Sequence, residues 1–239
     1  MRFKLRTLEW KTDETLARTT DEYWSSWLLA HLGTEWKNML DLGGGSGGRT
    51  AKFADGKRLI TCMDISREQI ERGRKRYGKT PNFYYVLGDA HFLPFKNNAF
   101  DVVHCWAALH HFPDRRKALT EIYRVLRPGG RLVALEPGKL NPLAAPARTF
   151  FPTPSHEPSE KPFIPSMLEK LVSQYFVNVK VRHFGTITYV LPFLLARLGS
   201  ISKLARPIAL HLIRLDDRLS SILKEFAGII AVKAEKAAV

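Results

Sequence analysis

Residues 39–49 read MLDLGGGSGGR, and this stretch decides the fold. The residues up to Leu42 predict a strand, and five of the six residues that follow are glycine. Glycine adopts positive φ at little steric cost, but fixing it costs more chain entropy than fixing any other residue. Such a run is typical of a backbone that must approach a ligand closely. Residues 49–53 then predict the start of a helix, whose first N–H groups would face the loop.

The glycines fit two patterns of nucleotide-cofactor binding. Gly43, Gly45 and Gly48 match GxGxxG, which is typical of dinucleotide sites. The other pattern, DxGxGxG, is matched by Asp41, Gly43, Gly45 and Gly47. The charge of Asp41 favours the second interpretation, because a carboxylate opposes a pyrophosphate and attracts a ligand that carries an ammonium and a sulfonium. S-adenosylmethionine is such a ligand. A purely structural glycine turn is the alternative.

Further strands are predicted at regular intervals after the glycine loop. They cover residues 58–64, 82–90, 99–105 and 131–136, and helical segments separate them. Alternating strands and helices predict a parallel sheet with right-handed crossovers. Ligands of such sheets bind at the carboxyl ends of the strands. The glycine loop, Asp64, Asp89 and Cys105 all follow or end strands, so we expect them at one shared edge.

The glycine loop and the four later strands occur in the order and spacing of a known family. The chain resembles the class I S-adenosylmethionine-dependent methyltransferases, and most closely the subfamily that includes the quinone-biosynthesis methyltransferases. The resemblance is strong over residues 36–137. It implies an α/β, Rossmann-like fold with a seven-stranded, mostly parallel sheet, an antiparallel final strand and helices on both faces. It also implies S-adenosylmethionine as cofactor and S-adenosylhomocysteine as product. The expected cofactor-binding residues are Asp41, Gly43, Gly44, Gly45, Gly47, Asp64, Ile65, Asp89, Ala90, Cys105 and Tyr23.

We expect residues 1–239 to form a single methyltransferase domain with three additions. Residues 1–35 would contain a helix over 22–31, capped by Thr20 or Asp21, which covers the cofactor through Tyr23. Residues 137–165 carry eight prolines, so they predict a loop that walls the substrate pocket. Residues 187–224 predict a helical insertion between the last two strands, 177–183 and 226–236, which the resemblance pairs as antiparallel neighbours.

The insertion has an apolar stripe at helical spacing, formed by Leu204, Ile208, Leu212, Leu215 and Leu219. One interpretation is packing on the body of the domain. The alternatives are a lid over an apolar substrate or a face that rests on a membrane. Arginines beside leucine and isoleucine suit a helix at the surface of an anionic membrane.

The formal net charge of +14 indicates nucleic acid, an anionic membrane surface or a solvated basic face. An RNA methyltransferase is therefore the second hypothesis. Base-modifying amino-methyltransferases often carry an Asn/Asp-Pro-Pro-aromatic tetrapeptide after the fourth strand, but this chain reads CWAA at residues 105–108. No appended RNA-binding module is evident either. We therefore favour a small, apolar or lipid-like methyl acceptor. A non-catalytic binding protein that uses the fold as a scaffold is a third class. In such a protein the cofactor-binding residues should have been lost, whereas Asp41, Asp64 and Asp89 are all present.

Methyl transfer from a sulfonium requires mainly alignment of the acceptor and exclusion of water. A general base matters only for a weak nucleophile such as a phenol. The candidate bases are His110 and His111, which follow the fourth strand, and His156 in the proline-rich loop. No spacing of Cys, His and acidic residues predicts a metal site. Cys62 and Cys105 fall on central strands and are expected to be buried thiols.

The N-terminal residues have no long apolar core typical of a signal peptide. No uninterrupted apolar stretch approaches the roughly 20 residues of a membrane-spanning helix. The sequence therefore predicts a cytoplasmic protein, with peripheral contact to an anionic membrane as the further hypothesis.

Overall fold

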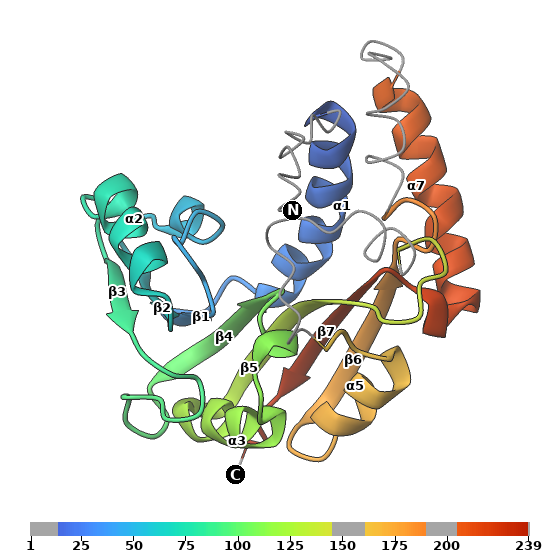
Figure 1. The fold of residues 1–239 in the computed structure, drawn as a ribbon. Helices are drawn as coiled ribbons and strands as arrows, with labels where there is room; N and C mark the ends of the chain where they lie inside the picture. Colours follow the sequence, from blue (N-terminus) through green and yellow to red (C-terminus); the bar gives the residue numbers. More distant parts are fainter. Residues whose placement is uncertain (1–13, 145–160, 190–204, 239) are drawn as a thin grey trace, which may run out of the picture.

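A seven-stranded sheet forms the centre of the protein in the computed structural model, which describes residues 14–144, 161–189 and 205–238. The order of the strands is β3-β2-β1-β4-β5-β7-β6. The strands are β1 (Asn38–Leu42), β2 (Leu59–Asp64), β3 (Phe83–Leu87), β4 (Phe100–Trp106), β5 (Leu126–Pro137), β6 (Val177–Phe184) and β7 (Ile229–Glu235). The first five run parallel, and β7 lies antiparallel between β5 and β6 (Figure 1). The predicted α/β fold class and the antiparallel final strand are confirmed.

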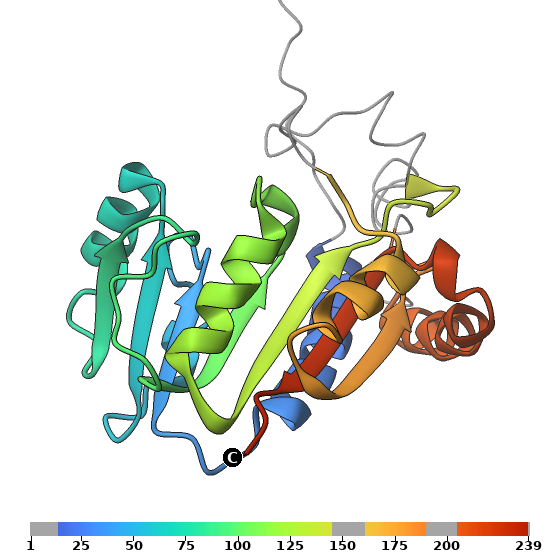
Figure 2. The same cartoon turned by 90° about the horizontal axis from the view of Figure 1, so that it is seen from below.

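The central strands are apolar because helices cover both faces of the sheet. On one face, α3 (Arg115–Val125) and α5 (Pro165–Val172) bury Leu119 and Leu168. On the other face, α1 (Glu14–Leu32) and α2 (Arg67–Tyr77) bury Leu28 and Ile70. Figure 2 shows α3 and α1 on opposite sides of the twisted sheet. The two apolar clusters hold the sheet rigidly, so the carboxyl ends of its strands keep fixed positions.

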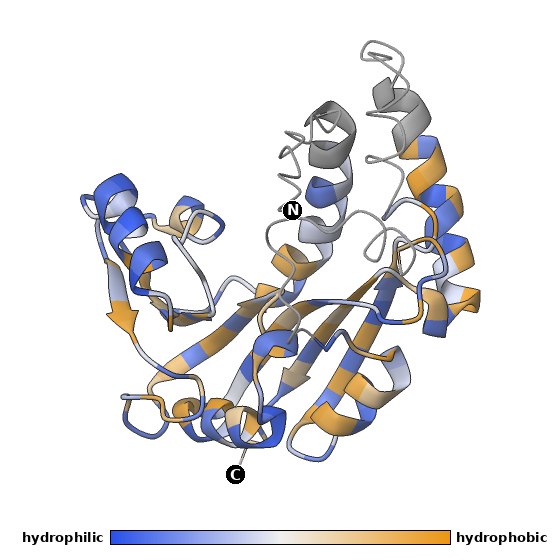
Figure 3. Ribbon diagram, viewed as in Figure 1, coloured by the Kyte–Doolittle hydropathy of each residue, from blue (hydrophilic) through white to orange (hydrophobic). Residues whose placement is uncertain are grey.

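The surface of α2 explains part of the basic charge. This helix is mostly hydrophilic in Figure 3, and only Ile70 and Gly73 are buried. Its cations lie on the solvent side, at Arg67, Arg72, Arg74, Lys75 and Arg76. The three in the last turn also interact favourably with the helix dipole. This group of charges therefore lies on an exposed face of the helix.

Two expected helices differ from the structure. The helix expected after the glycine loop is only the three-residue 3-10 helix η1 (Ala51–Phe53). A turn follows at once, in which Asp55 accepts hydrogen bonds from two N–H groups and Gly56 has a φ of +75°. The N-terminal helix is longer than expected, because α1 begins at Glu14 and Thr20 lies buried inside it. The predicted cap at Thr20 or Asp21 is therefore wrong, whereas the end before Gly33 is correct.

The insertion contains α7 (Ala205–Ile222), which lies beside α1 and against β6 (Figure 1). Its buried face is formed by Ile213, Asp216 and Ser220. The interpretation that the leucine stripe packs on the body of the domain is wrong at Leu215, which is 49% exposed. Leu212 and Leu219 are half-buried, and Leu204 and the side chain of Ile208 lie outside the described part.

Polar contacts set the rotation of α7. The carboxylate of Asp216 accepts hydrogen bonds from the N–H groups of Ile187 and Thr188, both at 2.9 Å. The hydroxyl of Ser220 accepts one from the N–H of Thr186 at 3.1 Å. A buried carboxylate costs much free energy unless it is hydrogen-bonded. These bonds therefore turn the Asp216 face toward the sheet.

We predict that Leu119→Ala, in the core of α3, lowers the free energy of unfolding by about 2–5 kcal/mol, because it leaves a cavity under the sheet. The matched control is Leu215→Ala, the same change on the exposed side of α7, which should cost less than about 1 kcal/mol. Denaturant unfolding monitored by circular dichroism measures both values. Equal losses for the two variants would contradict the assignment of the core.

Candidate functional site

The glycine loop turns sharply at the carboxyl end of β1. Gly43, Gly45 and Gly47 have φ values of +68°, +56° and +76°, which L side chains rarely adopt. The N–H groups of Gly43 and Gly44 donate to the carbonyl of Met63, at 2.8 and 3.2 Å. The loop is thus anchored to the end of β2, and its glycines are required by the backbone geometry.

Asp64 ends β2 and links the loop to the next helix. One of its oxygens, Oδ2, accepts a hydrogen bond from the N–H of Gly45 at 2.8 Å, and Oδ1 accepts one from the N–H of Ser66 at 2.8 Å. The hydroxyl of Ser66 caps α2 by accepting from the N–H of Gln69 at 3.3 Å. The carboxylate is therefore held in one orientation at the edge of the sheet.

Asp89 follows β3 and is paired with His91. Its Oδ1 lies 2.6 Å from Nδ1 of the imidazole and 2.9 Å from the N–H of the same residue. The other ring nitrogen, Nε2, accepts from the N–H of Asp114 at 3.2 Å, so the ring proton is on Nδ1. The backbone N–H of His91 is the main group that lowers the pKa of Asp89. Asp89 is therefore a carboxylate at neutral pH.

The segment after β4 forms the third wall, and a buried carboxylate shapes it. Glu136, at the end of β5, has no exposed surface. It accepts hydrogen bonds from the N–H groups of Ala108 (3.1 Å), Leu109 (2.9 Å) and His110 (3.2 Å), and it lies 2.7 Å from Nδ1 of His110. These bonds fix the turn that carries His111 and Phe112 to the edge of the sheet.

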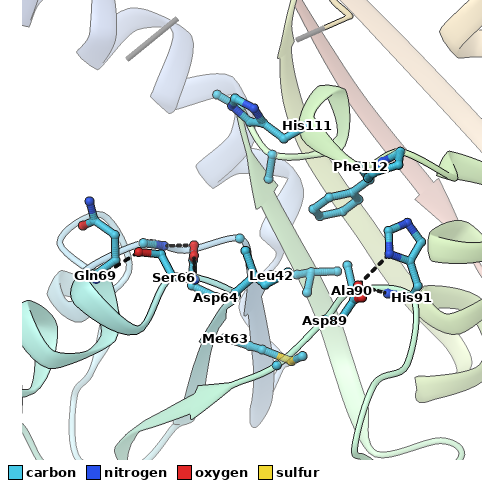
Figure 4. Close-up of a pocket in the computed structure, with 17 residues that line it drawn as sticks. Leu42, Met63, Asp64, Ser66, Gln69, Asp89, Ala90, His91, His111 and Phe112 are labelled. Carbon is cyan, nitrogen blue, oxygen red and sulfur yellow. Dashed lines mark hydrogen bonds and ion pairs between the residues drawn. The ribbon is translucent and has the colours of Figure 1, made fainter. Parts of the chain in front are cut away.

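These walls enclose a cavity of about 580 Å³ at the carboxyl ends of β1, β2 and β3 (Figure 4). Asp64 and Ser66 lie on one side, and Asp89, His91 and Phe112 gather on the other. Among the described residues, the lining contains two carboxylates and no lysine or arginine. It consists of Leu42, Gly43, Gly45, Met63, Asp64, Ile65, Ser66, Gln69, Gly88, Asp89, Ala90, His91, Ala107, Ala108, His111, Phe112 and Pro113.

Seven of the residues expected from the sequence line this cavity, namely Gly43, Gly45, Asp64, Ile65, Asp89, Ala90 and His111. Gly44 and Gly47 belong to the loop but face the protein. A Cβ on Gly44 would lie 2.4 Å from Oδ2 of Asp41, and one on Gly47 would lie 2.8 Å from the ring of Phe83. These two glycines serve close packing.

Asp41 lies behind the loop and is 2% exposed. Its Oδ1 is 2.8 Å from Nδ1 of His104 on β4, and its Oδ2 accepts from the hydroxyl of Thr50 at 2.5 Å. The carboxylate is therefore occupied by protein groups and is not among the residues of the cavity wall. This position suits it to hold the loop in place.

Three other expected residues are not among the described residues of the cavity wall, namely Cys105, Tyr23 and His110. Cys105 is fully buried in the core, and burial raises the pKa of its thiol. Tyr23 lies on α1, with its ring 5.9 Å from that of Phe184. His110 is buried against Glu136. His156 and most of the proline-rich loop lie outside the described residues.

Ten lining residues were not expected, including Ser66, Gln69 and His91. Ser66 and Gln69 could have been found, because Ser-x-x-Gln before a helix is the capping-box pattern. The spacing of Asp89 and His91 also indicates a local acid–imidazole pair. Met63 and Phe112 carry no such signal. Among the described residues, no group of three or more Cys, His, Asp or Glu side chains could hold a metal ion. No helix in this part of the chain is long and apolar enough to cross a membrane.

Comparisons with known proteins find similarity over the central part of the chain. Residues 40–134 match a family described as "Methyltransferase domain". The Vibrio cholerae ubiquinone/menaquinone biosynthesis C-methyltransferase UbiE is 38% identical over 123 residues, which are 49% of this chain and 46% of that protein. The chain thus spans about half the length of the relatives that it matches in sequence.

Solved structures share the fold at low sequence identity. The N-methyltransferase NodS from Bradyrhizobium japonicum, solved with S-adenosyl-L-homocysteine, has a TM-score of 0.58 at 15% identity, over 90% of this chain and 87% of that one. The [4+2]-cyclase SpnF has a TM-score of 0.63 at 18% identity, over 91% and 82%. Because the same fold carries different activities, these structures establish architecture alone. Residues 40–134 therefore match a methyltransferase-domain family, and the solved structures share the architecture of the chain.

Proposed function

We propose that this protein is an enzyme that transfers the methyl group of S-adenosylmethionine to a ring carbon of a small, lipid-like acceptor of the quinol type. The observation that carries the proposal is the cavity bounded by the glycine loop and two fixed carboxylates. The 38% identity to a quinone C-methyltransferase supports the class of acceptor. The RNA alternative has no comparable support.

The residues of the cavity fit the cofactor chemically. S-adenosylmethionine offers hydrogen-bond donors at its ribose hydroxyls, adenine amine and ammonium group, and Asp64 and Asp89 are carboxylate acceptors. We assign the ribose hydroxyls to Asp64, at the end of the second strand. A Cβ at Gly45 would meet only Oε1 of Gln69, at 3.8 Å, so this side of the loop is open to a ligand. We further propose that Asp41 positions the loop without touching the cofactor.

When bound, the cofactor supplies a methyl group that its sulfonium charge has already activated. The protein has to hold the acceptor carbon about 3–3.5 Å from that methyl group and keep water out. Ala107, Ala108 and Phe112 offer an apolar wall for a ring. Of the candidate bases among the described residues, His111 is the one that lines the cavity. We propose that His111 removes the proton of an acceptor hydroxyl, since neutral imidazole accepts a proton near pH 7.

Asp64→Ala should weaken binding of S-adenosylhomocysteine by roughly 1.5–3 kcal/mol, the range for hydrogen bonds to a charged group. The matched control is Asp55→Ala. Asp55 also accepts two backbone N–H bonds, but it lies in the turn after η1. Both variants should lose some thermal stability, and only Asp64→Ala should lose affinity in calorimetry. Unchanged affinity in Asp64→Ala would refute the assignment of this residue.

Gly45→Val should abolish cofactor binding, because its side chain would enter the cavity. The control is Gly129→Val, since Gly129 has a φ of +72° and open space around its Cβ. Forcing a side chain into this backbone conformation costs roughly 1–2 kcal/mol in each variant. Both proteins should therefore be destabilised alike in thermal melts, while only Gly129→Val binds S-adenosylhomocysteine. Normal binding by folded Gly45→Val would show that the loop faces elsewhere.

The activity is tested directly by incubating the protein with methyl-labelled S-adenosylmethionine and either a demethylated quinol with a short prenyl chain or total RNA. We expect labelled quinol whose new methyl group is on carbon by NMR, and no labelled RNA. His111→Ala should lower kcat by roughly 10²-fold or more if the histidine acts as a base. Labelled RNA with unreacted quinol would overturn the proposed acceptor and leave the cofactor assignment intact.

A further inference from the structure

A second cleft, which we call the basic cleft, lies between α3 and α5 and has a volume of about 570 Å³. It shares no lining residue with the cofactor cavity. The two are neighbours through one backbone group, because the carbonyl of His110 accepts hydrogen bonds from the N–H of Lys161 (3.4 Å) and from Arg115 (3.5 Å). The lining of the basic cleft is Arg115, Arg116, Lys139, Lys161, Pro162, Phe163, Ile164, Met167, Lys170, Leu171 and Gln174.

Five cations line the basic cleft, and its described lining residues include no carboxylate. Within the described residues, none of the five forms an ion pair with an acid. Arg115 lies over the ring of Phe163 at 4.1 Å, and Arg116 donates to Oε1 of Gln174 at 2.8 Å. Like charges gathered in a cleft focus a positive potential and raise the local concentration of anions. An anionic ligand would offset their repulsion.

One wall of the basic cleft is apolar. Met167 and Leu171 are four residues apart on one side of α5, and Ile164 lies directly before the helix. The side chain of Met167 is 63% exposed, so this apolar strip is open to solvent. Cations beside an apolar strip match a ligand that has an anionic head and a hydrocarbon part.

We propose that the basic cleft binds an amphiphile that carries a phosphate group. Arginine forks and lysine ammonium groups are the side chains that bind phosphate oxygens best. The hydrocarbon part would lie along Ile164, Met167 and Leu171. A phospholipid headgroup and a free alkyl phosphate share this chemistry. The site is separate from the cofactor cavity and does not depend on the identity of the methyl acceptor.

Titration with octyl phosphate, inorganic phosphate and octyl glucoside tests the proposal by calorimetry. Octyl phosphate should bind more tightly than inorganic phosphate, because the chain adds apolar burial, and octyl glucoside should not bind. Raising the salt concentration should weaken binding without abolishing it. Co-sedimentation with phosphatidylcholine vesicles, with and without phosphatidic acid, is the second arm. If the protein binds vesicles that contain phosphatidic acid, the phosphate group belongs to a lipid headgroup. If it binds octyl phosphate but not these vesicles, the ligand is a free alkyl phosphate.

The decisive variant is the double substitution Lys139→Gln and Lys170→Gln, which should lower affinity by about tenfold or more. The matched control is Lys75→Gln with Lys79→Gln, the same loss of charge at exposed positions on and after α2. Thermal melts verify that both proteins fold. Absence of binding to either phosphate amphiphile would overturn the proposal. Equal loss of affinity in the two double variants would also overturn it. The same holds for RNA binding that is lost only in the Lys139→Gln, Lys170→Gln variant.

Discussion

The buried carboxylate of Asp41 is the interaction on which the site depends. It connects three parts of the chain, because β1 carries it, His104 meets it from β4, and Thr50 donates to it from the far end of the glycine loop. An unpaired charge at this depth would cost several kcal/mol, so its partners must stay in place. The loop also approaches the carboxylate so closely that Gly44 cannot carry a side chain. The curvature of the loop, and with it the position of Gly45, follows from this arrangement.

A second buried carboxylate acts in the same way on the other side of β4. Asp41 belongs to β1 and Glu136 to β5, and these two strands flank β4 in the sheet. Glu136 fixes the turn after β4 by accepting three backbone N–H bonds. Both acids are fully paired inside the protein, whereas Asp64 and Asp89 reach the cavity. The site thus has an inner pair of acids, Asp41 and Glu136, that hold its walls, and an outer pair, Asp64 and Asp89, that line the cavity.

The sequence predicted the sheet, the shared edge and the outer acids, because parallel strands carry their carboxyl ends to one side. It did not predict the pairing of Asp41 with His104, because the two residues are 63 positions apart and that pairing has no local pattern. The same limit applies to α7. Its spacing indicated a leucine stripe as the buried face, but tertiary hydrogen bonds to Asp216 decided the rotation of the helix. Features that arise from strand order were predictable, and features that arise from single long-range contacts were not.

The short helix η1 affects the electrostatics of the cavity. A long α-helix after the loop would place the positive end of its dipole beside the ligand and favour anions. A single turn of Ala51–Phe53 aligns few peptide groups, so its contribution is small. The two carboxylates then dominate the potential of the cavity, whose described lining contains no lysine or arginine. A negative potential holds a sulfonium more strongly than a neutral thioether. In the proposed reaction, loss of the methyl group would therefore weaken binding of the demethylated cofactor, so electrostatics would favour product release.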